Sequence, residues 1–298
     1  MTLYNLKLPK KINSTYECIT LLNFQFVSII TKVNGFDEIR FDFTNLKWID
    51  AEMTVVLAMM IEISLLTCDS VTVEIDNLDD NVKTILRKNN FFPLYGIDSA
   101  LFDTYDTTIN FFAENPSKDR LIYEYIHEEV FKSIGGSISD IFLKEVSYCI
   151  FELVHNIIDH SDSDRVYICG QSYPKKGFLR LAISDKGVGI PALIKQRNPH
   201  IQKDTKAVEW ALGEGNTTKI GREGGIGLYS IRDKLLNRGS LKVISNQAFY
   251  QINSNGSIIE KTLSERFRGT LIILEFDINK CLKTRDSNKV FTDEILGF

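Results

Sequence analysis

The sequence predicts an α/β protein of two successive domains, the first of them an α/β sandwich. In about the first hundred residues, strand-like runs alternate with helical patterns. Farther along, an apolar stripe at helical spacing over 143–158 is followed by a strand-like run at 178–183. A polar, proline-bearing break at 114–118 lies between these two halves and predicts domains at 1–115 and 118–298.

The N-terminal domain is expected to contain two strands and two helices. The predicted strands are 38–44 and 70–76, and the predicted helices are 51–66 and 81–89. We interpret 51–66 as amphipathic. Its apolar run, 53–61, is far too short to span a bilayer and is bounded by Glu52 and Glu62. No membrane partner is therefore expected.

Composition indicates a cytoplasmic protein without a nucleic-acid partner. The formal net charge of −4 provides no basic surface for phosphate backbones. The five cysteines form no Cys-x-x-Cys pair, so reduced thiols are expected. The N-terminus lacks the pattern of a secretory signal peptide.

The helical run near 152–160 contains the first set of candidate ligands. Glu152, Asn156 and His160 follow one another at four-residue spacing, so they lie along one helix face. An amide oxygen is a hard, neutral ligand that Mg²⁺ accepts together with water and substrate phosphates. Asn156 is therefore the candidate metal ligand. Glu152, one turn earlier, is the candidate catalytic base for a water attacking a γ-phosphate.

Two glycine-bearing segments complete the pattern. Asp185 ends the strand-like run and can accept a hydrogen bond from an exocyclic amino group such as that of adenine. The glycines that follow it allow the backbone to approach a flat base, and those of the second segment expose N–H groups at a helix N-terminus, where phosphates bind. The candidate residues are Gly187, Gly189 and Ile190 in the first segment and Gly224, Gly225, Gly227 and Leu228 in the second.

On these motifs, residues 118–298 resemble the GHKL (Bergerat-type) ATP-binding domain of gyrase B, MutL, sensor histidine kinases and anti-sigma-factor serine kinases. The helical run matches the N-box, and the two glycine segments match the two glycine boxes. The Gly-Thr pair ending at Thr270 matches the one that begins a final strand, and its threonine would help hold adenine. The resemblance implies ATP and Mg²⁺ as cofactors, and a second α/β sandwich that has a mixed sheet with helices on one face.

The same resemblance implies a mobile lid between Ile190 and Gly224. The segment 213–219 resembles the Ser-Thr-Lys lid of several sensor kinases, where Lys219 would reach the phosphates. A solvated loop lysine is an equal alternative. A short helix is expected within the lid at 207–212.

The N-terminal domain resembles the STAS domain of anti-sigma-factor antagonists in 41–53 and 82–91. Phosphorylated STAS switches have a serine directly after the aspartate that corresponds to Asp50, whereas this chain has Ala51. Ala51 has no hydroxyl to accept a phosphoryl group. We therefore expect a fixed docking or dimerisation module.

Three functions remain open. The resemblance favours a signalling ATPase or serine/threonine protein kinase that acts on another protein. The alternatives are a non-catalytic, ATP-gated binding module and an ATP-driven dimerisation clamp of the MutL/gyrase type. The clamp is disfavoured because little chain follows the strand of Thr270. The expected partners are ATP and a regulator or substrate protein, and a homodimer is left open.

Overall fold

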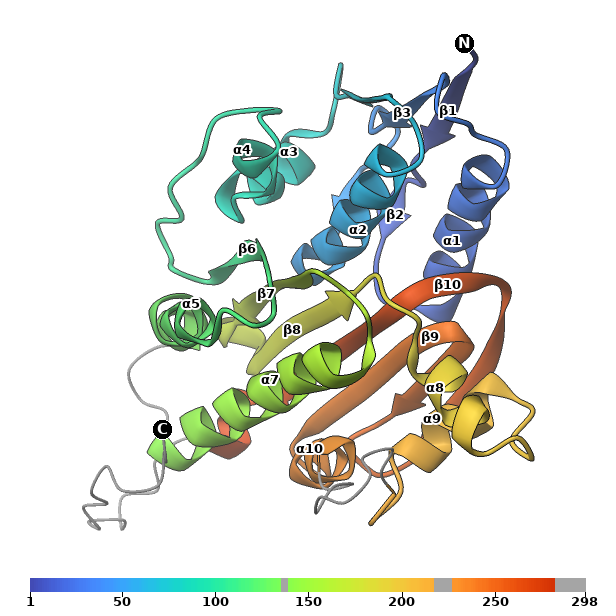
Figure 1. The fold of residues 1–298 in the computed structure, drawn as a ribbon. Helices are drawn as coiled ribbons and strands as arrows, with labels where there is room; N and C mark the ends of the chain where they lie inside the picture. Colours follow the sequence, from blue (N-terminus) through green and yellow to red (C-terminus); the bar gives the residue numbers. More distant parts are fainter. Residues whose placement is uncertain (135–138, 217–226, 282–298) are drawn as a thin grey trace.

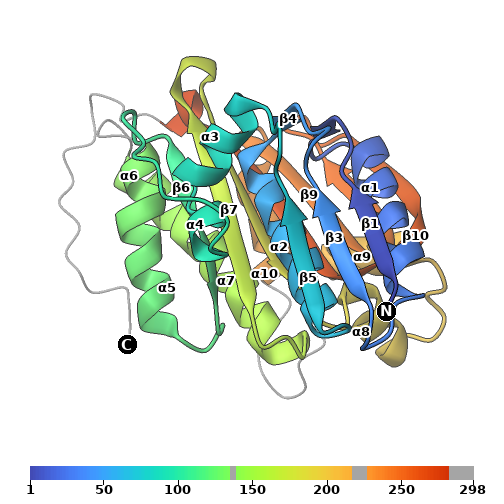
Figure 2. The same ribbon diagram turned by 90° about the horizontal axis from the view of Figure 1, so that it is seen from above.

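The computed structural model describes residues 1–134, 139–216 and 227–281. The elements stack in four layers: a three-stranded sheet, the helices α1 and α2, a five-stranded sheet, and an outer layer that includes α5, α7 and α10 (Figures 1 and 2). The strands are β1 (Leu3–Lys7), β2 (Lys11–Ile12), β3 (Glu38–Asp42), β4 (Trp48–Ile49), β5 (Ser70–Glu74), β6 (Thr108–Glu114), β7 (Val166–Tyr173), β8 (Phe178–Asp185), β9 (Gly239–Ile252) and β10 (Ile258–Asp277). The helices are α1 (Tyr16–Ile30), α2 (Thr54–Leu65), α3 (Asp80–Lys88), α4 (Phe91–Leu94), α5 (Asp119–Tyr125), α6 (Phe131–Ile134), α7 (Asp140–His160), α8 (Ile190–Arg197), α9 (Asp204–Ala211) and α10 (Gly227–Leu235).

The N-terminal sheet has the strand order β1-β3-β5, and both neighbouring pairs are parallel. The expected strands at 38–44 and 70–76 are confirmed as β3 and β5, each slightly shorter than predicted. The expected helices are confirmed as α2, preceded by a 3-10 turn at Ala51–Met53, and as α3. Asp79 caps α3 by accepting the N–H of Asn81.

The prediction that 51–66 is amphipathic is wrong. Almost every residue of α2 is buried, because the helix lies between the N-terminal sheet and strands β7 and β8 of the five-stranded sheet. A helix that is apolar on all sides is a helix buried on all sides. Two of its buried hydroxyl groups are hydrogen-bonded: the Ser64 hydroxyl donates to the Met60 carbonyl within the helix, and the Thr54 hydroxyl accepts from the side chain of Asn89.

The five-stranded sheet has the order β6-β7-β8-β10-β9, and every neighbouring pair among these strands is antiparallel. The expectation of a mixed sheet is therefore wrong. The expectation that the helices of 118–298 lie on one face is confirmed for the described residues. Helices α5, α7 and α10 belong to the core on one face, while α1 and α2 of the N-terminal domain cover the other (Figure 2).

The polar break at 114–118 does not separate the two sheets. Strand β6 ends at Glu114 and pairs with β7, so the segment before the break already belongs to the five-stranded sheet. The break joins β6 to α5. The polar composition of 114–118 correctly indicated a boundary between two elements. It could not indicate that β6, the element before it, pairs with β7.

The Gly269–Thr270 pair does not begin the final strand. β10 starts at Ile258, eleven residues earlier in the chain, and pairs with β9 for most of its length. Register shifts occur on both sides of Phe267, and Gly269 has a φ of +79°. The pair therefore marks an irregularity inside one long strand. None of the helices in the described ranges combines the length and apolar character needed to cross a bilayer.

Candidate nucleotide site

Helix α7 carries the first group of candidate residues. The helix predicted at 143–158 is confirmed and runs from Asp140 to His160, with the Ser139 hydroxyl accepting the N–H of Phe142 at its start. Its apolar stripe packs in the core against the five-stranded sheet. Glu152, Asn156 and His160 are only partly buried and lie along the edge of this stripe, and His160 is the last residue of the helix.

The side chain of Asn156 has an unmet hydrogen bond. Its Nδ2 atom is fully buried and has no hydrogen-bond partner among the residues that the structure describes. A buried donor without a partner costs about 1–3 kcal/mol. Mg²⁺ is usually held by one or two protein oxygens together with phosphates and water. The Asn156 amide fits such a site, because its NH₂ group can donate to a phosphate while its oxygen binds the cation.

Glu152 lies one helical turn after Tyr148. Burial raises the pKa of the Tyr148 phenol, and the nearby Glu152 carboxylate raises it further. The phenol therefore stays protonated beside that carboxylate. The ammonium of Lys234, from α10, lies 5.1 Å from the centre of the Tyr148 ring, so α10 and α7 are neighbours at this point.

Asp185 is the last residue of β8, and its side chain is buried. Its Oδ1 accepts the N–H of Gly187 at 2.8 Å, and the backbone of Thr270, its partner on β10, supplies a second hydrogen bond. Burial outweighs these two bonds and raises the pKa of the carboxyl group to about 7. The site therefore holds a carboxyl group that a suitable donor would drive into its ionised form.

The loop after Asp185 rests directly on the end of α7. Val188 N–H donates to the Ser161 carbonyl at 2.9 Å, and a Cβ on Gly187 would lie only 1.8 Å from that same oxygen. Only glycine fits at 187 without moving the backbone. This contact joins the segment that carries Asp185 to the helix that carries Asn156.

Ser245 on β9 contacts the candidate site and was not among the residues predicted from the sequence. Its hydroxyl accepts the N–H of Ile190 at 3.0 Å and donates to the Gly269 carbonyl at 3.0 Å, and it lies 2.9 Å from the Thr270 hydroxyl. One fully buried serine thus links the start of α8 to the Gly-Thr pair. Ser245 follows Val243 and Ile244 but precedes Asn246 and Gln247, so no local pattern marks it.

Some of the remaining candidate residues lie within the described part of the chain, and others lie outside it. Ile190 begins α8, Gly227 begins α10, and Ile190 and Leu228 pack against the core. The helix expected at 207–212 is confirmed as α9. Three further candidates, Lys219, Gly224 and Gly225, lie outside the described residues.

The comparisons with known proteins agree with this geometry. Residues 143–279 match the family described as histidine kinase-, DNA gyrase B- and HSP90-like ATPase. This segment is a GHKL-type ATPase domain. The GHKL domain thus contains α7, the Asp185 loop and Thr270, and it supports ATP binding. The search of curated proteins found no match for the chain.

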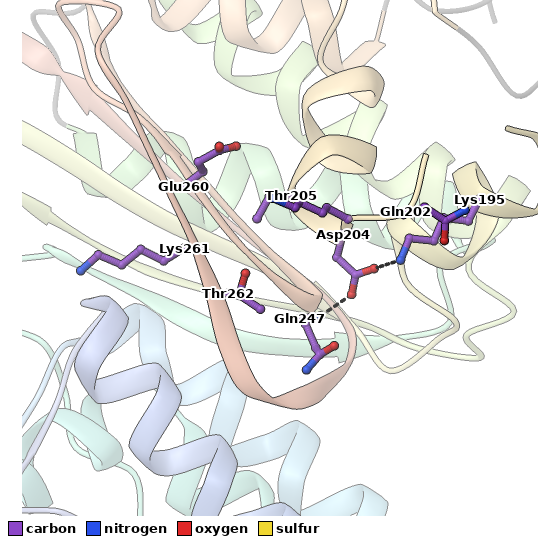
Figure 3. Close-up of a pocket in the computed structure, with 9 residues that line it drawn as sticks. Lys195, Gln202, Asp204, Thr205, Gln247, Glu260, Lys261 and Thr262 are labelled. Carbon is purple, nitrogen blue, oxygen red and sulfur yellow. Dashed lines mark hydrogen bonds and ion pairs between the residues drawn. The ribbon is translucent and has the colours of Figure 1, made fainter. Parts of the chain in front are cut away.

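A separate groove lies between the start of α9 and the β9–β10 hairpin (Figure 3). It has a volume of about 360 Å³ and is lined by polar side chains that include Lys203, Gln247 and Lys261. Asp204 accepts the N–H of Gln247 at 2.8 Å and pairs with Lys195, which fixes α9 and α8 to β9. Among the candidate nucleotide residues that the structure describes, none lines this groove.

Proposed function

We propose that this chain is an ATP·Mg-binding regulatory protein that acts on another protein as a signalling ATPase or a serine/threonine kinase. One observation carries the proposal. Within a GHKL-type domain, the loop after the buried carboxyl group of Asp185 is hydrogen-bonded to the end of the helix that bears the unsatisfied amide of Asn156. This contact supports a site in which Asp185 would recognise the base and Asn156 would bind phosphate or metal on the adjoining segment.

In this proposal, Asp185 accepts a hydrogen bond from the amino group of adenine. A guanine would present a carbonyl oxygen at that position, which an ionised carboxylate repels. Gly187 and Gly189 bring backbone close to the base, and Thr270, held by Ser245, lines the same side. The nucleotide choice follows from the donor and acceptor pattern of the base.

The phosphates would lie toward α7 and the start of α10. Asn156 would hold Mg²⁺ through its amide oxygen, and the cation would neutralise charge on the phosphates. Glu152 would take a proton from the attacking water or from the hydroxyl of a substrate serine or threonine. Tyr148, protonated beside Glu152, would help to orient that carboxylate.

The position of Ala51 supports an acceptor outside this chain. Ala51 is fully buried, and its carbonyl accepts the thiol hydrogen of Cys169 on β7 at 3.3 Å. The residue that would correspond to a STAS switch therefore lies beneath the five-stranded sheet. A STAS-like domain held in this way fits a fixed module better than a phosphorylated switch.

The experiment is incubation with γ-labelled ATP and Mg²⁺, alone and with cell extract. Labelled phosphate released by the purified chain indicates an ATPase, and label on a second protein indicates a kinase. Bound, unchanged ATP would instead favour the ATP-gated binding module. Absence of ATP binding under all conditions would contradict the proposal.

A further inference from the structure

The N-terminal domain makes direct contact with the segment that carries Asp185. We infer that Glu62 on α2 positions Lys186, and with it the adenine-binding loop, so that ATP binding and docking of the N-terminal domain favour each other. This inference rests on the proposed ATP site. It adds a positioning residue from outside the GHKL match at 143–279, together with a route by which the N-terminal domain controls the affinity for nucleotide.

Both sequence neighbours of Asp185 touch α2. The Ser184 hydroxyl lies 3.4 Å from the Met59 sulfur, and the Lys186 ammonium lies 3.4 Å from a Glu62 carboxylate oxygen. Met59 and Glu62 are three residues apart, so they lie on one face of the helix. The same face of α2 thus holds the chain immediately before and immediately after Asp185.

Glu62 is the centre of a hydrogen-bonded group that joins the two domains. Its carboxylate accepts the Tyr167 hydroxyl at 2.7 Å and the Tyr95 hydroxyl at 3.2 Å, and it pairs with Arg165 at 3.3 Å. The Glu62 side chain is only 13% exposed, which limits screening of these charges by water. The position of the Glu62 carboxylate is therefore determined by hydrogen bonds from β7 as well as by its own helix, α2.

Lys186 transmits this position to the loop. Its side chain is 10% exposed and reaches both Glu62 and Asp164, the latter at 3.0 Å. Its backbone N–H donates to the Ser163 hydroxyl at 3.3 Å. Side chain and backbone are both anchored, so displacement of Glu62 displaces the residue next to Asp185. Coupling between two sites is reciprocal, and a nucleotide that orders this loop also strengthens the docking of α2.

A double-mutant cycle on ATP affinity tests the inference. Glu62→Gln and Lys186→Met are each expected to weaken ATP binding by about fivefold or more. The double variant should lose no more than the larger single effect, because Glu62 acts through Lys186. Lys186→Arg, which keeps the cation, should retain most of the affinity.

Asp50→Asn is the matched control. Asp50 also pairs across the domain interface, with Arg180 at 3.4 Å, but Arg180 is five residues before Asp185 on β8, or about 16 Å along the strand. It should change ATP affinity by less than about twofold. Equal losses of ATP affinity in Asp50→Asn and Glu62→Gln would indicate a general loosening of the interface and overturn the inference. A double variant whose loss of affinity is the product of the two single losses would also overturn it.

The reciprocal effect is measured by thiol labelling. Cys169 is buried at the interface in contact with Ala51, whereas Cys149 is buried in the core on the other face of the sheet. ATP should slow the labelling of Cys169 by about fivefold or more relative to Cys149, and Glu62→Gln should remove that protection. If the wild type binds ATP without protecting Cys169, the inference fails alone. If the wild type binds no ATP, the proposed function fails with it.

Discussion

Asp185 and Thr270 face each other across β8 and β10, and the Thr270 backbone is hydrogen-bonded to the Asp185 carboxyl group. Gly269, directly before Thr270, lies so close that a Cβ there would be 1.9 Å from the Asp185 carbonyl oxygen. The irregularity inside β10 thus brings backbone directly against the segment whose buried carboxyl group is expected to recognise the base.

Substitution of Gly269 tests that close approach. Gly269→Ala should destabilise the fold by at least about 2 kcal/mol more than Gly256→Ala. Both glycines have a φ of +79°, so both variants carry the same left-handed strain of about 1–2 kcal/mol. At 256 the nearest atom is a leucine methyl 3.4 Å away, whereas at 269 it is backbone. Chemical denaturation of the two variants measures the difference, and equal losses would contradict the steric account.

Substitutions on α7 separate binding from chemistry. Asn156→Ala should weaken Mg²⁺-dependent ATP binding, because it removes the proposed metal ligand. Glu152→Ala should leave binding largely intact and lower turnover by roughly 10²–10⁴-fold if Glu152 is the base. Calorimetric titration and phosphate release measure the two effects. Wild-type turnover in Glu152→Ala would remove that residue from the catalytic role.

Glu52 should make the stability depend on pH. It is fully buried beside Arg180, and burial raises its pKa from 4.5 to about 7. Because the unfolded chain ionises first, stability is lost as pH rises from 4.5 through 7. The free energy of unfolding of Glu52→Gln, relative to that of the wild type, should therefore increase by on the order of 1–3 kcal/mol between pH 4 and pH 8. The free energy of unfolding of both proteins would be measured by denaturation across this pH range. A difference between them that does not change with pH would rule this out.

The N-terminal domain should not become phosphorylated. Ala51 has no hydroxyl, and even Ala51→Ser would place its hydroxyl beneath β7, where the position is fully buried. Both proteins should remain unlabelled at 50–56 after incubation with ATP, as mapped by mass spectrometry. Phosphate within that segment would show that the two domains separate and that the module is a switch.

Local sequence patterns predicted the helices and strands themselves better than the tertiary packing and strand pairing around them. The periodicity of 143–158 and the run after 178 identified α7 and β8 because each depends mainly on its own residues. The uninterrupted apolar run of α2 was a sign of burial on all sides, although its second covering sheet lies more than 100 residues away in the chain. The pairing of β6 with β7 likewise depends on distant segments.

The candidate site shows the same division. Asp185 and Asn156 belong to local motifs, so the sequence alone was enough to propose them as candidates. Ser245 and Glu62 contact the site only through tertiary packing: Glu62 and Lys186 are 124 positions apart. A single serine or glutamate in a helix or strand carries no local signal of such a contact.

Nucleotide choice at Asp185 tests the central claim most directly. The measurement is calorimetric titration of ATP and GTP, each with Mg²⁺, into the wild type and Asp185→Asn at pH 8 and pH 5.5. We expect ATP to bind the wild type more tightly than GTP by about 1.5–3 kcal/mol at pH 8, the strength of a hydrogen bond to a charged group.

The preference should shrink at pH 5.5, because a carboxyl group with a pKa of about 7 is then protonated and can donate to guanine. Asp185→Asn should lose the preference at both pH values. Equal binding of ATP and GTP by the wild type at pH 8, or an unchanged ATP preference in Asp185→Asn, would contradict the account.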